Sequence, residues 1–335
     1  MVVDGFGVSL SKKRGRILVR SSEGKWEFAI KNVREVIVSG KASITSDLLK
    51  TLAANGVGLL ITSYTGLPLA RLMPARAGGT ARNRVEQYRA LEDGRGCWII
   101  KYLLLGKLRN QASNLRYYSK ARKDMEEKTM LYDKASMIKE FADKLEKKDP
   151  GEGLKACREE LMAVEAQAAS IYWDGMRIVY SDYGFRERLK RPQIRKGAEL
   201  DPVNLLLNIG YNLLAGTIWK YVIHFSLDPF AGYLHVERSG RLSLVYDLIE
   251  PFRPIMDRFV ASYLRSNKSM IKSDKKKMDL IVDFKRRYYD DFLSIKSRYR
   301  GRKHRLETIM FMYVEDIVSY LNGRKTYIPT PYIPW

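Results

Sequence analysis

Cysteine, histidine and acidic side chains are scarce in this chain of 335 residues. It holds two cysteines and three histidines, and 38 acidic residues stand against 60 lysines and arginines. Cys97 and Cys157 lie far apart, without the close spacing of a structural zinc site. Two thiols in a chain of this length predict a reducing, intracellular setting and no disulfide framework.

Several catalytic motifs are also missing. The sequence contains no Gly-x-x-x-x-Gly-Lys-Ser/Thr and no Gly-x-Gly-x-x-Gly, so nucleotide hydrolysis and dinucleotide binding have no support. It contains no Gly-x-Ser-x-Gly, and neither cysteine has a histidine in a plausible relationship. The first residues have no apolar core followed by a cleavage site, and we therefore expect no secretory signal.

Long apolar runs are equally rare, and the longest, residues 203–219, carries a polar stripe. Asn204, Asn208 and Asn212 recur every four residues and fall on one side of a helix, and Lys220 follows. This pattern is typical of a helix buried inside a protein and not of a membrane span. We therefore expect a cytoplasmic protein that makes no membrane contact.

Positive charge is what the sequence has in excess. The formal net charge is +22, and both the first 80 residues and the remainder have more basic than acidic side chains. Because lysine and arginine release counterions when they bind phosphates, a nucleic acid is the partner that this excess favours. Charge alone leaves a membrane surface or an acidic protein as alternatives.

The order of sequence patterns predicts an α+β protein with a small N-terminal β-rich domain and a larger all-α catalytic domain. Residues 1–76 contain short β-branched or aromatic runs (GRILVRS, KWEFAI, REVIVSG, VGLLITS) and one helical segment, DLLKTLAAN. Two glycines after Arg76 mark a boundary, and residues 77–323 follow helical spacing, including an apolar stripe through 280–299. Residues 324–335 hold three prolines and predict an extended tail.

The stretch from Leu227 to Pro254 places a histidine ahead of two carboxylates. Asp247 and Glu250 are three residues apart, so on a helix both project from one face, and His235 precedes them. An imidazole and two carboxylates form a ligand set suited to Mn²⁺ or Mg²⁺. The prolines that follow Glu250 allow a plainer interpretation, in which Asp-x-x-Glu caps a helix. These residues alone leave both interpretations open.

A further carboxylate lies on a helix predicted over residues 154–176. Glu165 shares one helix face with Leu161 and Ala168. A carboxylate in an apolar stripe is costly unless it is paired or binds a metal. Glu165 is therefore either a satisfied glutamate at the edge of the core or a metal ligand.

Candidate phosphate contacts fall in two places. Between residues 180 and 198, aromatic and basic residues alternate, as expected near a nucleic-acid backbone, although a solvated basic loop would look the same. Arg253 and Arg258 lie close to the carboxylates in the chain and either neutralise ligands, hold phosphate or pair with Asp257. The candidates in the first group are Arg188, Lys190, Arg191 and Arg195.

Several blocks together carry a family resemblance. Leu-Asp-Pro-x-x-Gly-x-Leu-His at 227–235, followed by Asp-Leu-x-Glu-Pro-Phe-Arg-Pro at 247–254, resembles the CRISPR-associated spacer-acquisition integrase, the universal larger subunit of the adaptation complex. The blocks at 107–111 (Lys-Leu-Arg-Asn-Gln), 164–166 (Val-Glu-Ala) and 195–211 (Arg, then Asp-Pro-Val-Asn-x-Leu-Leu-Asn-x-x-Tyr) occur in the family's order. The resemblance covers most of the chain and is strongest from about 160 to 260.

The resemblance implies a metal site and a reaction. Glu165, His235 and Glu250 would bind a divalent metal, Mg²⁺ or Mn²⁺, and Asp247 would support the site. The chain would be a metal-dependent DNA integrase and endonuclease of CRISPR adaptation. It would join the 3′-OH ends of captured fragments to the CRISPR repeat by transesterification, and it would also cleave or process branched DNA.

The resemblance also implies partners. These are double-stranded and branched DNA, a small companion subunit with a ferredoxin fold, and a second copy of the chain that contacts the first through the N-terminal domain. Two alternatives remain at this point: a metal-dependent, structure-specific DNA repair nuclease, and a non-catalytic basic scaffold that binds nucleic acid.

Overall fold

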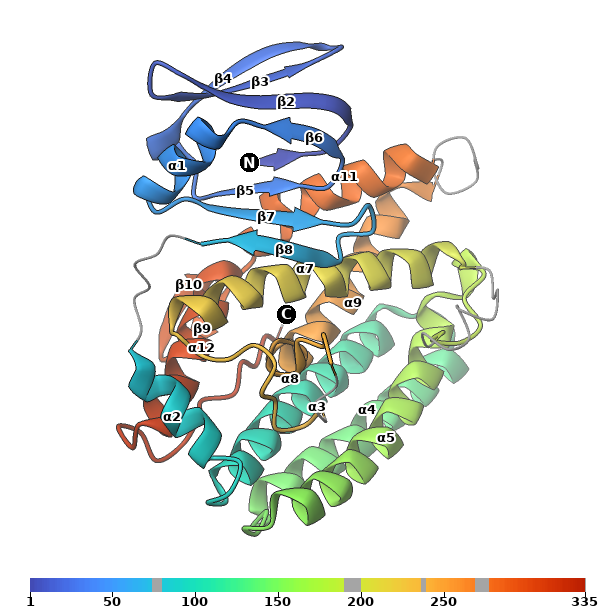
Figure 1. Cartoon of the computed structure of the whole chain (residues 1–335). Helices are drawn as coiled ribbons and strands as arrows, with labels where there is room; N and C mark the ends of the chain where they lie inside the picture. Colours follow the sequence, from blue (N-terminus) through green and yellow to red (C-terminus); the bar gives the residue numbers. More distant parts are fainter. Residues whose placement is uncertain (74–79, 190–199, 236–238, 269–276, 335) are drawn as a thin grey trace.

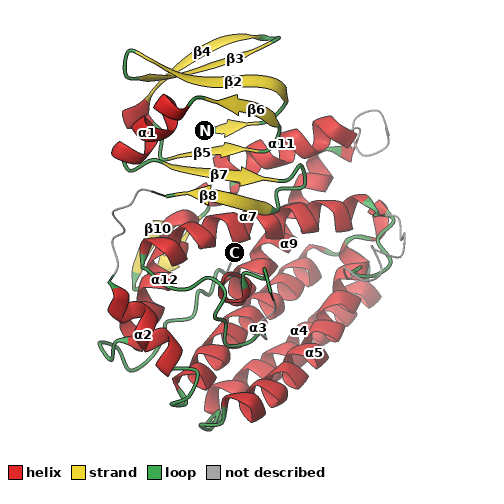
Figure 2. Cartoon of the chain, viewed as in Figure 1, coloured by secondary structure: helices red, strands yellow, loops and turns green. Residues whose placement is uncertain are grey.

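The structure is a computed structural model, and it describes residues 1–73, 80–189, 200–235, 239–268 and 277–334. Strands gather at one end of the molecule (Figure 1), and helices form most of the remainder (Figure 2). This is the α+β class that the sequence predicts, with a small strand-rich N-terminal part before a mostly helical part. The domain boundaries themselves stay predictions.

Two four-stranded sheets build the N-terminal part, with strand orders β1-β5-β7-β8 and β4-β3-β2-β6. Their hydrophobic core includes Ile17 and Val36 from the strands and Leu48 and Leu52 from one helix, whose first turn is capped by the side chain of Thr45. The elements are β1 (Val2–Val3), β2 (Phe6–Lys13), β3 (Arg16–Ser21), β4 (Gly24–Ala29), η1 (Ile30–Asn32), β5 (Glu35–Val38), β6 (Lys41–Ile44), α1 (Ser46–Ala54), β7 (Gly58–Thr62) and β8 (Pro68–Leu72).

The helical part packs around a second, larger core. Helices α3, α4 and α5 lie side by side in Figure 1. The helices are α2 (Ala81–Arg89), α3 (Arg95–Ala121), α4 (Met125–Lys147), α5 (Leu154–Val179), α7 (Pro202–His224), α8 (Ser243–Leu248), α9 (Arg253–Ser266), α11 (Lys277–Asp290) and α12 (Leu306–Leu321). Short 3₁₀ turns are η2 (Ser181–Tyr183), η3 (Glu250–Phe252) and η5 (Phe292–Ser294).

Helix α7 joins the two parts and confirms the interpretation of the asparagine stripe. Asp201 caps its first turn by accepting a hydrogen bond from the backbone N–H of Asn204. Asn212 donates to the carbonyl of Thr65 at 3.0 Å, which ties the helix to the turn between β7 and β8. The stripe therefore serves packing. None of the helices in the described ranges has the length and apolarity that a membrane crossing needs.

The prediction of one helix through residues 280–299 is wrong for its second half. Helix α11 ends at Asp290, and β9 (Lys296–Tyr299) pairs antiparallel with β10 (Arg302–Arg305). Along β9 the side chains alternate between exposed and buried, a period of two that overrides the helical spacing of the apolar residues. Arg300 and Gly301 make the turn with positive φ angles of 48° and 77°. The larger part is therefore mostly helical and not purely so.

The expectation of no disulfide is also wrong. Cys97 of α3 and Cys157 of α5 form a disulfide between positions 60 residues apart in sequence. The packing of α3 against α5 brings these two cysteines together. The spacing of cysteines along the sequence could not predict a contact between such distant positions. The bond joins the two helices near their N-terminal ends.

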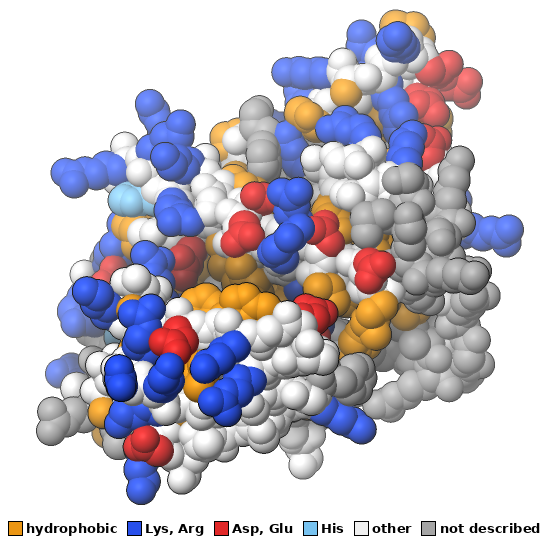
Figure 3. All heavy atoms as spheres, turned by 90° about the horizontal axis from the view of Figure 1, so that it is seen from above, with side chains coloured by type: hydrophobic (Ala, Val, Ile, Leu, Met, Phe, Trp, Pro, Cys, Tyr) orange, Lys and Arg blue, Asp and Glu red, His pale blue; other side chains and the backbone are white. Residues whose placement is uncertain are grey.

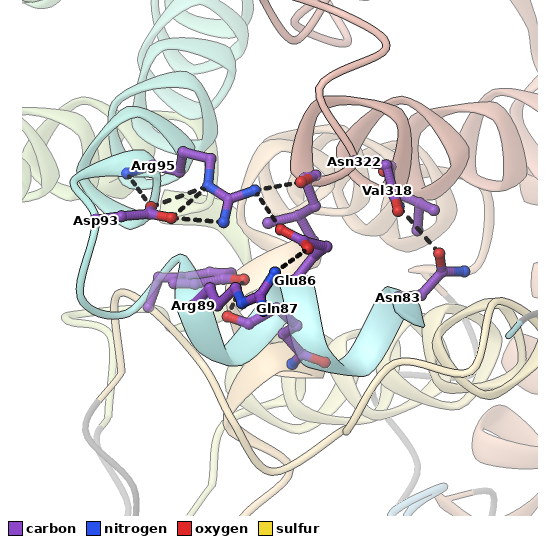
Figure 4. Close-up of polar contacts among 10 residues, drawn as sticks. Asn83, Glu86, Gln87, Arg89, Asp93, Arg95, Val318 and Asn322 are labelled. Carbon is purple, nitrogen blue, oxygen red and sulfur yellow. Dashed lines mark hydrogen bonds and ion pairs between the residues drawn. The ribbon is translucent and has the colours of Figure 1, made fainter. Parts of the chain in front are cut away.

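Polar contacts fix α2 between the start of α3 and the end of α12 (Figure 4). The guanidinium of Arg95 donates to Asp93 and, at 3.0 Å, to Glu86. It also donates to a backbone carbonyl at the end of α12. Asn322 donates to the side chain of Asn83 at 2.9 Å. Helix α2 is therefore held at both ends.

Asp257 of α9 is a buried polar centre that joins three helices. Its carboxylate accepts hydrogen bonds from Tyr172 of α5 at 2.9 Å and from Tyr211 of α7, and its carbonyl accepts from Tyr180 at 2.5 Å. Burial raises the pKa of Asp257 to about 6, although the two tyrosine hydroxyls act to lower it. Asp257 thus fixes α9 against α5 and α7.

Reduction of the disulfide should destabilise the protein. A bond that closes a loop of this length contributes on the order of 2–4 kcal/mol, because it restricts the unfolded chain. We expect the midpoint of urea unfolding to fall when dithiothreitol is added. A Cys97→Ala, Cys157→Ala double variant should match the reduced wild type and should not respond to reductant. Equal midpoints for oxidised and reduced wild type would show that the bond contributes nothing to stability.

Candidate active site

Lys107 joins two of the predicted metal ligands. It lies midway along α3, and its ammonium is 2.5 Å from Oε1 of Glu165 on α5 and 2.7 Å from Oε2 of Glu250 in η3. Two glutamates that are far apart in sequence therefore face the same cation. Lys107 opens the block at 107–111 that resembles the family, but it was not among the predicted site residues.

The close approach of α3 to η3 depends on Gly106 and Asn110. A Cβ atom on Gly106 would lie 3.1 Å from Cβ of Pro251, so a larger residue would push η3 away from the helix. Asn110 donates to the carbonyl of Pro251 at 2.9 Å and to that of Pro331 at 2.7 Å. The same asparagine thus also holds the C-terminal tail, whose Ile333 is buried against the chain's own core.

Glu250 is a buried carboxylate surrounded by cations. Its side chain is 4% exposed, and Nε of Arg253 lies 3.0 Å from its Oε1. Burial acts to raise the pKa of Glu250, but the positive charges of Arg253 and Lys107 outweigh it and lower the pKa to about 2. Burial acts to lower the pKa of Lys107, but the carboxylates of Glu250 and Glu165 raise it, so the lysine stays charged. Oε2 of Glu250 is buried, and its partner is the ammonium of Lys107 at 2.7 Å.

Asp247 holds the histidine. Its buried carboxylate accepts hydrogen bonds from the backbone N–H groups of Tyr233, Leu234 and His235 at 2.6, 2.9 and 3.0 Å. It also contacts Nδ1 of His235 at 2.6 Å. A proton on Nδ1 leaves Nε2 as the nitrogen with a free lone pair. Gly232 permits this geometry, because a Cβ there would lie 2.8 Å from Oδ2 of Asp247.

Gln87 of α2 anchors the loop that leads to the histidine. Its amide nitrogen donates to the carbonyls of Asp228 and Ala231 at 2.9 and 2.8 Å, and its amide oxygen accepts from the N–H of Asp228 at 2.7 Å. The hydroxyl of Tyr233 donates to the carbonyl of Gln87 at 3.1 Å. Gln87 was not predicted, because no sequence motif marks it.

The expectation that Asp247 and Glu250 lie on one α-helix is wrong, because Glu250 begins a 3₁₀ turn after that helix. Helix α8 ends at Leu248, and the two carboxylates serve different partners: Asp247 the histidine loop, and Glu250 the cations. The capping alternative is not observed either, because neither η3 nor α9 has a side-chain cap. The structure brings Glu165 and Glu250 together. Among the described residues, however, no group of three or more His, Cys, Asp or Glu side chains is arranged to hold a metal ion.

The predicted phosphate contacts have different surroundings. Arg188 donates to the side chains of Asn204 and Asn208 at 2.7 and 2.6 Å, which ties it to α7. Arg253 pairs with Glu250, and the guanidinium of Arg258 stacks 3.7 Å from the ring centre of Tyr117. The candidates Lys190, Arg191 and Arg195 lie outside the described residues.

Basic side chains are spread over the surface. Figure 3 shows lysines and arginines at many places on one face, interspersed with fewer acidic side chains. The distribution agrees with the composition, in which 60 basic residues outnumber 38 acidic ones and the basic residues are not confined to one tail.

Comparison with known proteins gives the family. The sequence model described as "CRISPR associated protein Cas1" matches residues 1–292. The chain belongs to the Cas1 family. It is 52% identical over 337 residues to the CRISPR-associated endonuclease Cas1 of Korarchaeum cryptofilum, with 100% of this chain and 98% of that protein covered.

Two solved structures share the Cas1 fold seen here. A casposase bound to an integration product superposes with a TM-score of 0.80 at 22% identity, covering 100% of this chain and 94% of that one. A chain of a Cas6-RT-Cas1–Cas2 complex superposes with a TM-score of 0.72 at 14% identity, covering 100% of this chain and 36% of that one. These likenesses show that the chain shares their fold.

Removing the charge of Lys107 should destabilise the fold. Lys107→Met leaves Glu165 and Glu250 facing each other with Arg253 as the remaining cation, and removal of one partner from a buried ion pair costs on the order of 3–5 kcal/mol. In the wild type, the stability that ionised Glu250 contributes is present above its unfolded pKa of 4.5 and is lost as the pH falls through about 2. Without the lysine, this loss should begin at a higher pH in urea unfolding curves recorded with EDTA.

Lys101→Met is the matched control for this prediction. Lys101 is a buried lysine on the same helix, but its ammonium donates to the carbonyl of Lys148 at 2.6 Å and does not pair with a carboxylate. We expect its replacement to cost about 1 kcal/mol without changing the acid limb of the stability curve. Equal effects of the two variants would refute the charge-bridging role of Lys107.

Proposed function

We propose that this Cas1 protein is a metal-dependent DNA integrase and endonuclease of CRISPR adaptation. It would join the 3′-OH ends of captured DNA fragments to the CRISPR repeat by transesterification. The observation that carries the proposal is the convergence of Glu165 and Glu250 on the ammonium of Lys107. Two carboxylates from separate elements that share one cation form the core of a divalent-metal site with a lysine in it.

The donor set fits Mg²⁺ or Mn²⁺. Glu165, Glu250 and His235 supply two carboxylates and an imidazole, the mixed oxygen and nitrogen set that these ions accept. Oε2 of Glu250 is buried against a cation, the ammonium of Lys107 at 2.7 Å, as expected for a carboxylate oxygen that can also serve as a metal ligand. When bound, the ion supplies Lewis-acid polarisation of a phosphoryl oxygen and activation of the attacking hydroxyl.

The neighbouring side chains set the geometry of these donors. Asp247 keeps the His235 ring in one orientation. With the proton on Nδ1, Nε2 is the ring nitrogen that would bind the metal. Arg253 holds the carboxylate of Glu250 from the opposite oxygen. The ammonium of Lys107 neutralises both glutamates and, beside a DNA phosphate, would offset the negative charge that develops in the transition state.

The number of phosphodiester bonds does not change in this reaction. The 3′-hydroxyl of the fragment loses its proton and its oxygen forms a bond to the phosphorus of the repeat. The bridging P–O bond of the repeat strand breaks, and the released 3′-oxygen takes up a proton, so that no net proton is gained or lost. One bond replaces another, so the step requires no nucleotide hydrolysis, in keeping with a sequence that lacks a phosphate-binding Gly-x-x-x-x-Gly-Lys-Ser/Thr motif. With water as the nucleophile, the same arrangement cleaves DNA.

We further propose that the chain acts on double-stranded and branched DNA as a homodimer with a small companion subunit of ferredoxin fold. The companion is supported by the presence of Cas2 in a complex with a chain of the same fold. The dimer is supported by β4, an edge strand on which Trp26 and Phe28 remain 43% and 39% exposed. Exposed aromatic side chains on a sheet edge favour contact with another chain.

An integration assay tests this function. Purified protein, with and without the companion subunit, would receive Mn²⁺, a labelled duplex with free 3′-OH ends and a supercoiled plasmid that carries a repeat. We expect label to be joined to relaxed plasmid. Glu165→Gln should reduce joining on the order of 100-fold or more, because it removes a charged ligand.

The control is Glu159→Gln, which changes an exposed glutamate on the same helix and should retain activity. Cleavage without joining, even with the companion subunit, would favour the repair nuclease. Equal joining by wild type and Glu165→Gln would overturn the active site. DNA binding without any reaction would favour the non-catalytic scaffold.

A further inference from the structure

A cleft lies where α3, α5 and α9 approach their C-terminal ends. It has a volume of about 380 Å³, near the lower end of the ~300–1,000 Å³ typical of small-molecule sites. We call it the tyrosine–arginine cleft, after the lining residues Tyr117, Tyr118, Tyr183, Arg258, Arg265 and Lys268. Along α3, Tyr117 is ten residues beyond Lys107, about 15 Å at 1.5 Å per residue, so the cleft is separate from the paired glutamates.

Aromatic rings form one part of this cleft. Tyr117 is 38% exposed, and Tyr118 meets it edge to face with ring centres 5.2 Å apart. The guanidinium of Arg258 covers the ring of Tyr117 at 3.7 Å and fixes its orientation. A flat ligand would find an ordered, accessible aromatic surface here, which lowers the entropic cost of stacking.

Positive charge exceeds negative charge in the cleft. Its charged side chains are Arg122, Arg258, Arg265 and Lys268 against Asp182 and Asp291. Asp182 pairs with Lys268 at 3.4 Å, and Asp291 pairs with Arg287, which lies outside the cleft, at 3.1 Å. Arg265 is exposed and forms no ion pair with any carboxylate in the described part of the chain. An anionic group would therefore meet a cation that is available to bind it.

We propose that the tyrosine–arginine cleft binds one nucleotide of single-stranded DNA, with its base stacked on Tyr117 and its phosphate held by Arg265. Aromatic stacking beside arginine is the combination by which proteins hold unpaired bases without reading their sequence. An acidic peptide would satisfy the cations but would leave the aromatic surface without a stacking partner. This inference rests on the proposed function, because it assumes that DNA is the substrate. It adds a DNA-binding site that is separate from Glu165 and Glu250.

Photo-crosslinking tests the location of the site. The full-length protein would be irradiated with single-stranded oligonucleotides that carry 5-iododeoxyuridine, and crosslinked peptides would be identified by mass spectrometry. We expect a crosslink at Tyr117 or Tyr118. The Glu165→Gln variant should lose integration and keep this crosslink, which separates failure of the cleft from failure of the active site. Crosslinks confined to other regions would overturn the proposal.

Binding measurements test the roles of the two residues. With a 2-aminopurine oligonucleotide, Tyr117→Ala should weaken binding on the order of tenfold and abolish the quenching of the base, whereas Tyr117→Phe should retain both. Arg265→Ala should reduce the slope of log K against log salt by about 0.7 for a single strand. Because Arg265 is exposed, this variant tests the cleft even if Tyr117→Ala unfolds.

Lys120→Ala is the matched control for charge. Lys120 is an exposed cation at the same end of α3 that does not line the cleft, so base quenching should remain unchanged. Equal loss of binding and quenching in Lys120→Ala and Arg265→Ala would reduce the site to a diffuse electrostatic surface and overturn the proposal. Binding of a mononucleotide as tight as that of the oligonucleotide would also overturn it, because the ligand would then be a free nucleotide.

Discussion

The helical part must hold two carboxylates, from Glu165 and Glu250, against one ammonium, that of Lys107. Glu165 and Glu250 are brought to the same ammonium, and without a cation between them their repulsion would oppose folding. The surrounding features keep α3, α5 and η3 in position. Gly106 permits the close approach and Asn110 ties η3 to α3, while the disulfide joins α3 to α5 and the tyrosines around Asp257 fix α9.

His235, the third proposed ligand, is held by a separate set of contacts. Gln87 of α2 and Asp247 of α8 hold the loop before it through backbone hydrogen bonds, and α2 is itself held between α3 and α12. The carboxylates lie on packed helical elements, whereas His235 depends on a loop with two polar anchors. Loss of either anchor would displace the imidazole and leave the carboxylate pair in place.

Local patterns in the sequence were sufficient for much of the fold. The cap of α7, the helix that carries Glu165 and the short helix of the N-terminal part follow from spacing and capping within a few residues. The disulfide and the role of Gln87 depend on contacts between distant segments, which periodicity does not record. The β9–β10 hairpin was missed because its apolar residues also fit a helical stripe. Glu250 was found through family resemblance, but its ion pair with Lys107 required the three-dimensional structure.

We propose that Lys107 occupies the position of the divalent cation between the two glutamates. Isothermal titration of Mn²⁺ into the wild type and into Lys107→Met tests it most directly, with Lys101→Met as the control. If the ammonium and the ion compete for the same carboxylates, Lys107→Met should bind Mn²⁺ more tightly, on the order of tenfold, while Lys101→Met should match the wild type. Unchanged or weaker binding by Lys107→Met would contradict the account.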